Sequence, residues 1–198
     1  MADKFLELAF TGSVLKAQDQ YYGSSQPVQS EAERDALTDD EIQFIQSRDS
    51  FYLGTVSESG WPYIQHRGGK TGFLHVIDPV TLAFADFKGN RQMLSTGNIA
   101  ANDRVCLFLM DYPQRTRLKI PGHARVDDAR QHPELVSRFA TPDAQRLVER
   151  IFFIDVVSFD WNCPKHITPR FTVEQIEEAV LPLKQRIAEL ERQLAQQN

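Results

Sequence analysis

The stretch that decides the fold is FYLGTVSESGWPYIQHR, residues 51–67. Its first six residues are rich in side chains that favour strands, and residues 57–60 have the composition of a tight turn. Residues 62–67 then predict the returning strand of a hairpin. The chain therefore enters an antiparallel β structure at about residue 50.

More strands are predicted beyond this hairpin. They are expected at residues 73–77, 81–86, 104–110, 117–126 and 151–159. Many short strands joined by turns, without regular strand–helix alternation, favour an antiparallel barrel or sandwich over a doubly wound sheet. Residues 104–110 are almost continuously apolar, so we expect that strand to be central. The sequence predicts a mainly β, α+β fold of six to eight strands with peripheral helices.

Helices are predicted around this β region. Thr38 and Glu41 have the spacing of a capping box and predict a helix that runs to about residue 48. Shorter helices are expected at residues 91–98, 133–139 and 143–149.

The last part of the chain predicts a C-terminal helix. We expect a barrel domain over residues 1–172 and an amphipathic helix over 173–198. Pro182 either kinks this helix or marks its true start. Its apolar residues follow a heptad spacing: Ile176, Val180, Leu183, Ile187, Leu190 and Leu194. This pattern suits packing on the chain's own domain or pairing with another helix, for which the length is marginal.

Composition and charge limit the function. The formal net charge of −5 argues against nucleic acid as a partner. Residues 61–125 nevertheless hold nine Lys and Arg against four Asp. That local excess reflects either solvated strand faces or an anion site for a phosphate. We expect a cytoplasmic protein without membrane association, because no run is apolar enough to span a bilayer and there are only two cysteines. The histidines show no metal-ligand spacing, and no metal is expected.

A strand-turn-helix pattern strengthens the phosphate interpretation. The segment FADFKGNRQ, residues 84–92, leads from a predicted strand to a predicted helix that opens at Asn90 and Arg91. A helix start offers free N–H groups, and an arginine adds a bidentate donor. Together with Arg67 and Lys70 on a neighbouring strand, these residues favour phosphate binding.

These motifs resemble those of pyridoxamine 5′-phosphate oxidases and their FMN-binding split-barrel relatives, over roughly residues 35–172. In that family a lysine eight residues after a strand proline binds the FMN phosphate, as Lys70 follows Pro62. Residues 90–92 stand where the family has Ser-Arg-Lys, with the arginine kept. Gln65 replaces a family arginine, and Arg67 supplies a replacement charge if the strand is regular.

The segment WNCPKHITPR, residues 161–170, extends the resemblance. The family has a Trp and a later Arg that reach FMN from the other subunit, and Trp161 and Arg170 match them. His166 and Thr168 stand where the family has the Arg and His that bind pyridoxal phosphate. The resemblance therefore implies a homodimer with shared flavin sites but argues against oxidation of vitamin B6 phosphates.

The cofactor-binding residues that we expect on these grounds are Gln65, His66, Arg67, Lys70, Asp86, Phe87, Asn90, Arg91, Gln92, Trp161 and Arg170. Because a flavin carries the redox chemistry itself, no catalytic residue is assigned. The resemblance implies an FMN-dependent oxidoreductase that acts on a small molecule. The alternative is a module that binds a flavin, or a related cofactor, without turnover.

Overall fold

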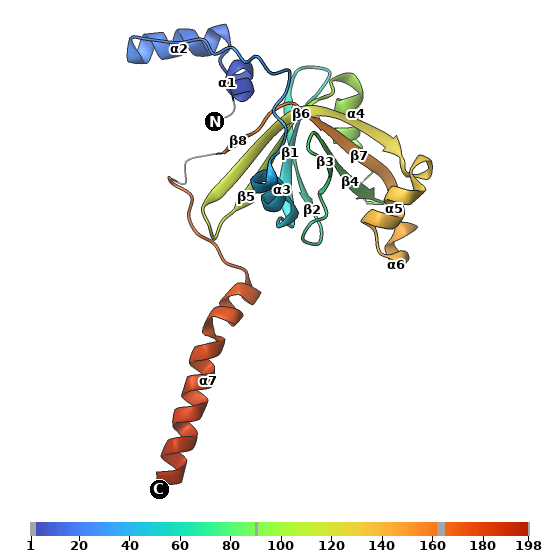
Figure 1. The fold of residues 1–198 in the computed structure, drawn as a ribbon. Helices are drawn as coiled ribbons and strands as arrows, with labels where there is room; N and C mark the ends of the chain where they lie inside the picture. The colour runs from blue at the N-terminus through green and yellow to red at the C-terminus, as the bar shows by residue number, and fades with distance from the viewer. Residues whose placement is uncertain (1–2, 90, 162–164, 198) are drawn as a thin grey trace. The chain divides into compact units, whose positions relative to one another are not determined.

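The computed structural model describes residues 3–89, 91–161 and 165–197 (Figure 1). The helices are α1 (Asp3–Ala9), α2 (Gly12–Tyr22), α3 (Asp39–Gln46), α4 (Leu94–Ala101), α5 (Pro133–Phe139), α6 (Pro142–Gln145) and α7 (Val173–Gln197), with a short 3-10 turn η1 (Ala129–Gln131). The strands are β1 (Ser50–Val56), β2 (Pro62–Gly68), β3 (His75–Asp78), β4 (Thr81–Phe87), β5 (Arg104–Asp111), β6 (Thr116–Asp128), β7 (Val148–Val156) and β8 (Asp160–Trp161).

One antiparallel sheet contains all eight strands. Their order is β2-β1-β5-β6-β7-β4-β3, and β8 pairs with β6. The hairpin predicted at residues 51–67 is confirmed, with β1 and β2 pairing in a continuous register from Ser50–Gly68 to Val56–Pro62. The predicted β fold with peripheral helices is therefore confirmed. The strands β2 and β3 form the two ends of the hydrogen-bonded order, so the curved sheet is open between them.

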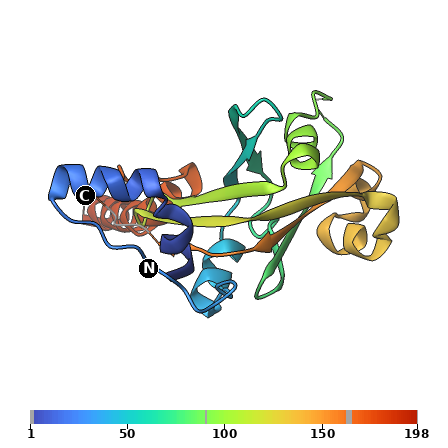
Figure 2. The same cartoon turned by 90° about the horizontal axis from the view of Figure 1, so that it is seen from above.

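The main core lies inside the curved sheet. It contains fully buried side chains from most strands and from α3, such as Ile45, Phe51, Phe84, Leu107 and Phe152. A second, smaller cluster lies on the opposite face of β4 and β7, where α5 covers Ala83, Ala85, Ile151 and Phe153. Figures 1 and 2 show α5 and α6 together beside one end of this pair of strands.

The central position of β5 is confirmed, and only one of its two faces is buried. Val105, Leu107 and Leu109 are buried, whereas Cys106 between them is exposed. The strands buried on both faces are β4 and β7 instead, because the helices lie over those two. The apolar sequence of β5 therefore predicted its central position in the sheet, but it did not predict that the outer face of the strand is exposed.

Two other predicted elements have different bounds. The helix expected at residues 91–98 begins at Leu94, and the helix expected at 143–149 is the single turn α6 followed directly by β7. The strand expected from residue 151 starts at Val148. Val148 to Arg150 lengthen β7 because they pair with the end of β4.

The capping box of α3 also makes a tertiary contact. As predicted, Thr38 and Glu41 form a capping box, in which the Glu41 carboxylate accepts from the Thr38 backbone N–H at 2.9 Å. The other Glu41 oxygen accepts a hydrogen bond from the Trp161 indole N–H. Burial acts to raise the pKa of Glu41, but the hydrogen bonds from Thr38 and Trp161 outweigh it and lower that pKa.

By contacts the chain divides into two compact units. One comprises Met1–Met110 with Arg117–Cys163, and the other comprises Asp111–Thr116 with Pro164–Asn198. The predicted C-terminal helix is confirmed as α7, and Pro182 lies inside it rather than at its start.

Candidate functional site

The edge strand β2 turns alternate side chains to opposite faces. Its pairing with β1 contains no bulge, so Tyr63, Gln65 and Arg67 share one face and line a small polar cavity. The strand is therefore regular, and Arg67 lies on the same face as Gln65.

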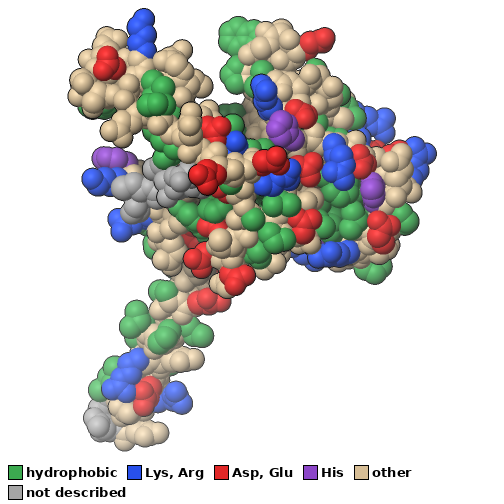
Figure 3. Space-filling view, turned by 45° about the horizontal axis from the view of Figure 1, so that its top comes forward, with side chains coloured by type: hydrophobic (Ala, Val, Ile, Leu, Met, Phe, Trp, Pro, Cys, Tyr) green, Lys and Arg blue, Asp and Glu red, His purple; other side chains and the backbone are tan. Residues whose placement is uncertain are grey.

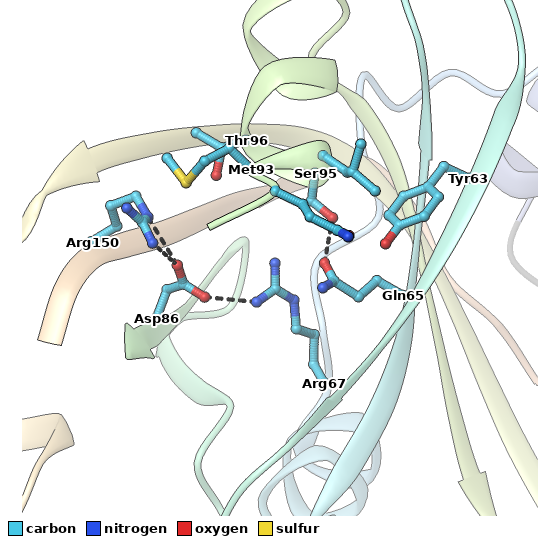
Figure 4. A pocket seen from close by; sticks show the side chains of 10 residues that line it. Tyr63, Gln65, Arg67, Asp86, Met93, Ser95, Thr96 and Arg150 are labelled. Carbon is cyan, nitrogen blue, oxygen red and sulfur yellow. Dashed lines mark hydrogen bonds and ion pairs between the residues drawn. The ribbon is translucent and has the colours of Figure 1, made fainter. Parts of the chain in front are cut away.

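Asp86 joins two arginines at this cavity (Figure 4). Its Oδ1 lies 2.7 Å from Arg67 Nη1, and its Oδ2 lies 2.9 Å and 2.8 Å from Arg150 Nε and Nη2. Asp86 and Arg150 are paired residues of β4 and β7, and Arg67 reaches them from β2. The lining of this cavity therefore carries two arginines and one carboxylate, while Glu149, outside that lining, lies 3.1 Å from Arg150 Nη2.

Arg67 retains capacity to bind an anion. Its guanidinium lies over the rings of Phe152 and Phe84, at 4.9 Å and 5.6 Å from their centroids. Its Nε is buried and has no hydrogen-bond partner among the described residues. A buried donor without a partner carries a desolvation cost, which an anionic oxygen would offset if the side chains that cover Nε moved aside on binding.

The start of α4 forms another wall of the cavity. Ser95 is buried and donates to Gln65 Oε1 at 2.7 Å, which fixes the helix start against β2. Residues 94–96 line the cavity, and their backbone N–H groups belong to the first turn, which lacks acceptors within the helix. The helix start predicted at Asn90 and Arg91 is therefore wrong: the left-handed residue Met93 (φ 58°) precedes Leu94.

A larger cavity of about 310 Å³ lies between the loop after β2 and the helices α5 and α6. It is lined by Gly68, Gly69, Lys70, Thr71, Gly72, Phe73, His75, Ala85, Phe87, Phe139, Ala140, Thr141 and Ala144. His75 stacks on Phe139 with ring centroids 4.0 Å apart. Burial, and then the nearby Arg138, lowers the pKa of His75, so its ring is neutral. Apart from Lys70, the described lining is therefore uncharged.

A third cavity, of about 210 Å³, adjoins both of the others. It shares Arg67 and Asp86 with the small polar cavity, and Phe73 and Phe87 with the larger one. The three together form one crevice beside the open edge of the sheet. One end is polar and cationic, and the other end is wide and mostly apolar.

The crevice contains most of the residues expected from the sequence. Gln65, Arg67, Asp86 and Gln92 line the polar cavity, His66 and Phe87 line the third one, and Phe87 and Lys70 line the large one. Arg91 is exposed and is not among the residues that line these three cavities. Asn90 lies outside the described residues.

Trp161 packs inside its own chain. Its ring meets Phe44 edge-to-face at 4.8 Å, while its N–H is taken by Glu41. Arg170 belongs to the smaller unit, is exposed, and has its guanidinium 4.8 Å from the centroid of Tyr112.

Arg150, Ser95 and Tyr63 line the site but were not expected from the sequence. Arg150 reaches Asp86 through the register of β4 and β7, which no local pattern reveals. Ser95 was missed because the predicted helix start lay too early. Tyr63 carried a usable signal, since it alternates with Gln65 and Arg67 on one strand.

The amino-acid sequence matches the family model described as pyridoxamine 5′-phosphate oxidase over residues 37–153. The chain belongs to this family. The matched region holds the whole crevice and ends within β7. It does not extend to Trp161 or Arg170. No curated protein matches the sequence.

Solved structures are similar to this chain at low sequence identity. A variant of HupZ from group A Streptococcus is 13% identical, with a TM-score of 0.50 over 64% of this chain and 99% of that one. A putative pyridoxamine 5′-phosphate oxidase from Lactobacillus delbrueckii is 18% identical, with a TM-score of 0.49 over 63% and 93%. An FMN-binding protein from Syntrophomonas wolfei is 10% identical, with a TM-score of 0.44 over 63% and 87%.

Among the described residues, no three or more His, Cys, Asp or Glu side chains gather as a metal site would require. None of the described helices is both long and apolar enough to cross a bilayer.

Proposed function

We propose that the protein is an FMN-dependent oxidoreductase that acts on a small molecule. The observation that carries the proposal is the crevice itself. It joins a cationic cavity, with a buried unpartnered donor on Arg67, to an apolar cavity large enough for a ring system.

The polar end suits the phosphate of FMN. Arg67 and Arg150 supply the charge, Gln65 keeps its amide N–H donors because its carbonyl accepts from Ser95, and the first turn of α4 adds backbone donors. Asp86 holds both guanidinium groups at the cavity before a ligand binds. Lys70, which the resemblance also assigns to the phosphate, lines the wide cavity instead, and Arg91 lines none of the three cavities, so we propose neither as a ligand of the phosphate at this end.

The wide end suits the flavin ring and the substrate. Phe73, Phe87 and Phe139 provide apolar and aromatic walls, and Lys70 places one cation at the same cavity. Bound FMN would supply the ring that exchanges two electrons with the substrate. The chain would position that ring, limit the access of water, and favour a substrate that is small, largely apolar and no more than singly negative.

Vitamin B6 phosphates do not fit this proposal. His166 and Thr168 stand where the family has an Arg and a His for the substrate phosphate. The wide cavity offers Lys70 alone among its described lining as a fixed cation. Pyridoxamine 5′-phosphate should therefore be a poor substrate, and efficient production of pyridoxal phosphate by the purified protein would show this part of the proposal to be wrong.

The active unit that we propose is a cytoplasmic homodimer. The outer face of β2, β1 and β5 presents Ile64, Tyr52 and Cys106, which lie on neighbouring strands and are exposed. A second copy of the chain would cover this face. In the shared site implied by the resemblance, Arg170 would contact the partner's flavin through its exposed guanidinium. Trp161 would contact that flavin through its ring, because its indole N–H already donates to Glu41.

Titration of the apoprotein with FMN, followed by flavin fluorescence quenching, tests the proposal. We expect saturable binding and, in the loaded protein, bleaching of the yellow absorption band by NADH or NADPH. Binding without bleaching by these or other two-electron donors would favour the alternative of a flavin-binding module. Absence of FMN binding would remove the oxidoreductase and the FMN-binding module, and would leave only a module for a related cofactor.

A further inference from the structure

The helix α7 exposes a continuous row of large apolar side chains. Ile176, Leu183, Ile187 and Leu190 are between 42% and 64% exposed, and Val180 between them is partly exposed. Figure 3 shows hydrophobic side chains at the surface of this helix, interleaved with charged ones. We propose that the α7 helices of two copies of this chain pair as a parallel two-stranded coiled coil. This inference rests on the proposed homodimer but does not depend on the proposed flavin chemistry.

The identities of the apolar residues select the number and direction of the helices. In the heptad, Val180 and Ile187 occupy a positions, and Leu183 and Leu190 occupy d positions. β-branched residues at a with leucine at d favour a parallel dimer over trimers and tetramers. The central two repeats follow this rule at every core position, whereas Ile176 at d and Leu194 at a extend the apolar row at its two ends with the reverse choice of residues.

The flanking charges favour the same direction. In a parallel pair, Arg186 at a g position faces Glu191 of the partner subunit at the following e position, and symmetry makes this attraction twice. In the fully overlapping antiparallel pair, e positions meet e positions and g positions meet g positions. Glu177 would then oppose Glu191, and Arg186 would oppose its own copy. The charge pattern therefore opposes the antiparallel arrangement.

Arg186 is available for this exchange. In the single chain its Nη1 lies 2.6 Å from Glu189, and both side chains are at least half exposed. A surface pair at this spacing contributes little, so its partial replacement by Glu191 of the partner subunit costs little.

Pro182 is compatible with the paired helix. It occupies a c position, away from the apolar row, and the hydrogen bond that it eliminates is to the carbonyl of Glu178 at an f position on the outer face. About three heptads are marginal for pairing of free peptides. Tethering two helices to one dimer raises their effective concentration to about the millimolar range, which favours pairing of a short helix.

Disulfide trapping in the full-length protein tests the proposal. In a background with Cys106→Ser and Cys163→Ser, we expect Leu190→Cys to form a disulfide-linked dimer under mild oxidation, seen on a non-reducing gel. Arg192→Cys, at an f position on the outer face, is the matched control and should stay monomeric on that gel. Circular dichroism of each variant would check that the fold is kept.

A mixed-chain experiment separates the two directions. In the overlapping antiparallel pair, Leu190 lies beside Val180 of the partner subunit and about 15 Å from its own copy. Cross-linking between Leu190→Cys chains and Val180→Cys chains, without self-linking of Leu190→Cys, would overturn the parallel arrangement. Absence of cross-links in both arrangements would overturn pairing altogether.

Charge exchange tests the register. Arg186→Glu and Glu191→Arg should each reduce the rate of the Leu190→Cys cross-link about fivefold, because two like-charged contacts replace two attractive ones. The double variant should restore the rate. Equal cross-linking in all four proteins would show that Arg186 and Glu191 of the partner subunit do not meet.

Discussion

Arg150 on β7 lies opposite Asp86 on β4, and two of its nitrogen atoms approach the same carboxylate oxygen at 2.9 Å and 2.8 Å. The other oxygen of Asp86 holds Arg67 from the far side of the crevice. A single carboxylate thus fixes two cations that come from strands distant in the sequence.

Asp86→Asn should destabilise the fold. Removing the carboxylate takes the anion from the mostly buried Arg67 and leaves Arg150 with the more exposed Glu149 alone, which should lower the free energy of unfolding by about 2 kcal/mol. Urea denaturation would measure it. The matched control is Asp128→Asn, which breaks an exposed pair with Arg130 and should change stability little. Similar losses in the two variants would mean that burial of the Asp86 cluster contributes nothing.

Arg67→Ala should weaken FMN binding about tenfold or more, because a charge-assisted hydrogen bond to phosphate is lost. Riboflavin, which has no phosphate, should bind the variant and the original protein equally. Fluorescence quenching with both ligands measures the difference. Arg104→Ala, an exposed arginine on β5, serves as the control. A parallel loss of riboflavin affinity would place Arg67 at the ring instead.

Ala144→Phe should have the complementary effect. The larger side chain would fill part of the wide cavity under α6, where we place the flavin ring. FMN and riboflavin should therefore lose affinity by a similar factor in the same quenching assay. If the affinity for FMN fell and the affinity for riboflavin did not, the phosphate would lie at the wide end and the proposed orientation would be reversed.

Glu41→Gln should flatten the acid dependence of stability. Because the pKa of Glu41 is lower in the folded chain than its ordinary value of 4.5, its stabilisation is present above that value. It is lost as the pH falls through the lower folded pKa. Urea denaturation at several pH values from about 3 to 7 would show a steeper acid loss for the original protein. Identical slopes would contradict the role given to the Thr38 and Trp161 hydrogen bonds.

Complementation between chains tests the shared flavin site. Arg67→Ala and Arg170→Ala should each weaken FMN binding as homodimers, because each removes one side of every site. A mixed dimer should regain one intact site with normal affinity, provided that subunits exchange. A monomer that binds FMN normally would exclude the shared site, and Arg170 would then have only its contact with Tyr112.

Local signals in the sequence predicted the fold well. The hairpin of β1 and β2 follows from strand propensity and turn composition, and the capping box of α3 from two residues three apart. The start of α4 was predicted too early. Met93 adopts a left-handed backbone conformation just before the helix, and nothing in residues 91–93 indicates this, because Met93 is not a glycine.

The candidate site was predicted only where one strand contributes several residues. Gln65 and Arg67 were expected together because alternation on β2 requires it. Arg150 and Asp86 are 64 residues apart in the sequence, and their contact depends on the register between β4 and β7. Short-range sequence patterns cannot predict that register.

The open edge between β2 and β3 has a dynamic consequence. Edge strands that lack a neighbour on one side exchange their amide hydrogens through small local openings. A ligand that bridges β2 and β4 across the crevice would suppress those openings, because it would have to dissociate before β2 could move away from β4. Loading with cofactor should therefore slow amide exchange in β2 and in the loop that follows it more than in β5, which has neighbours on both sides.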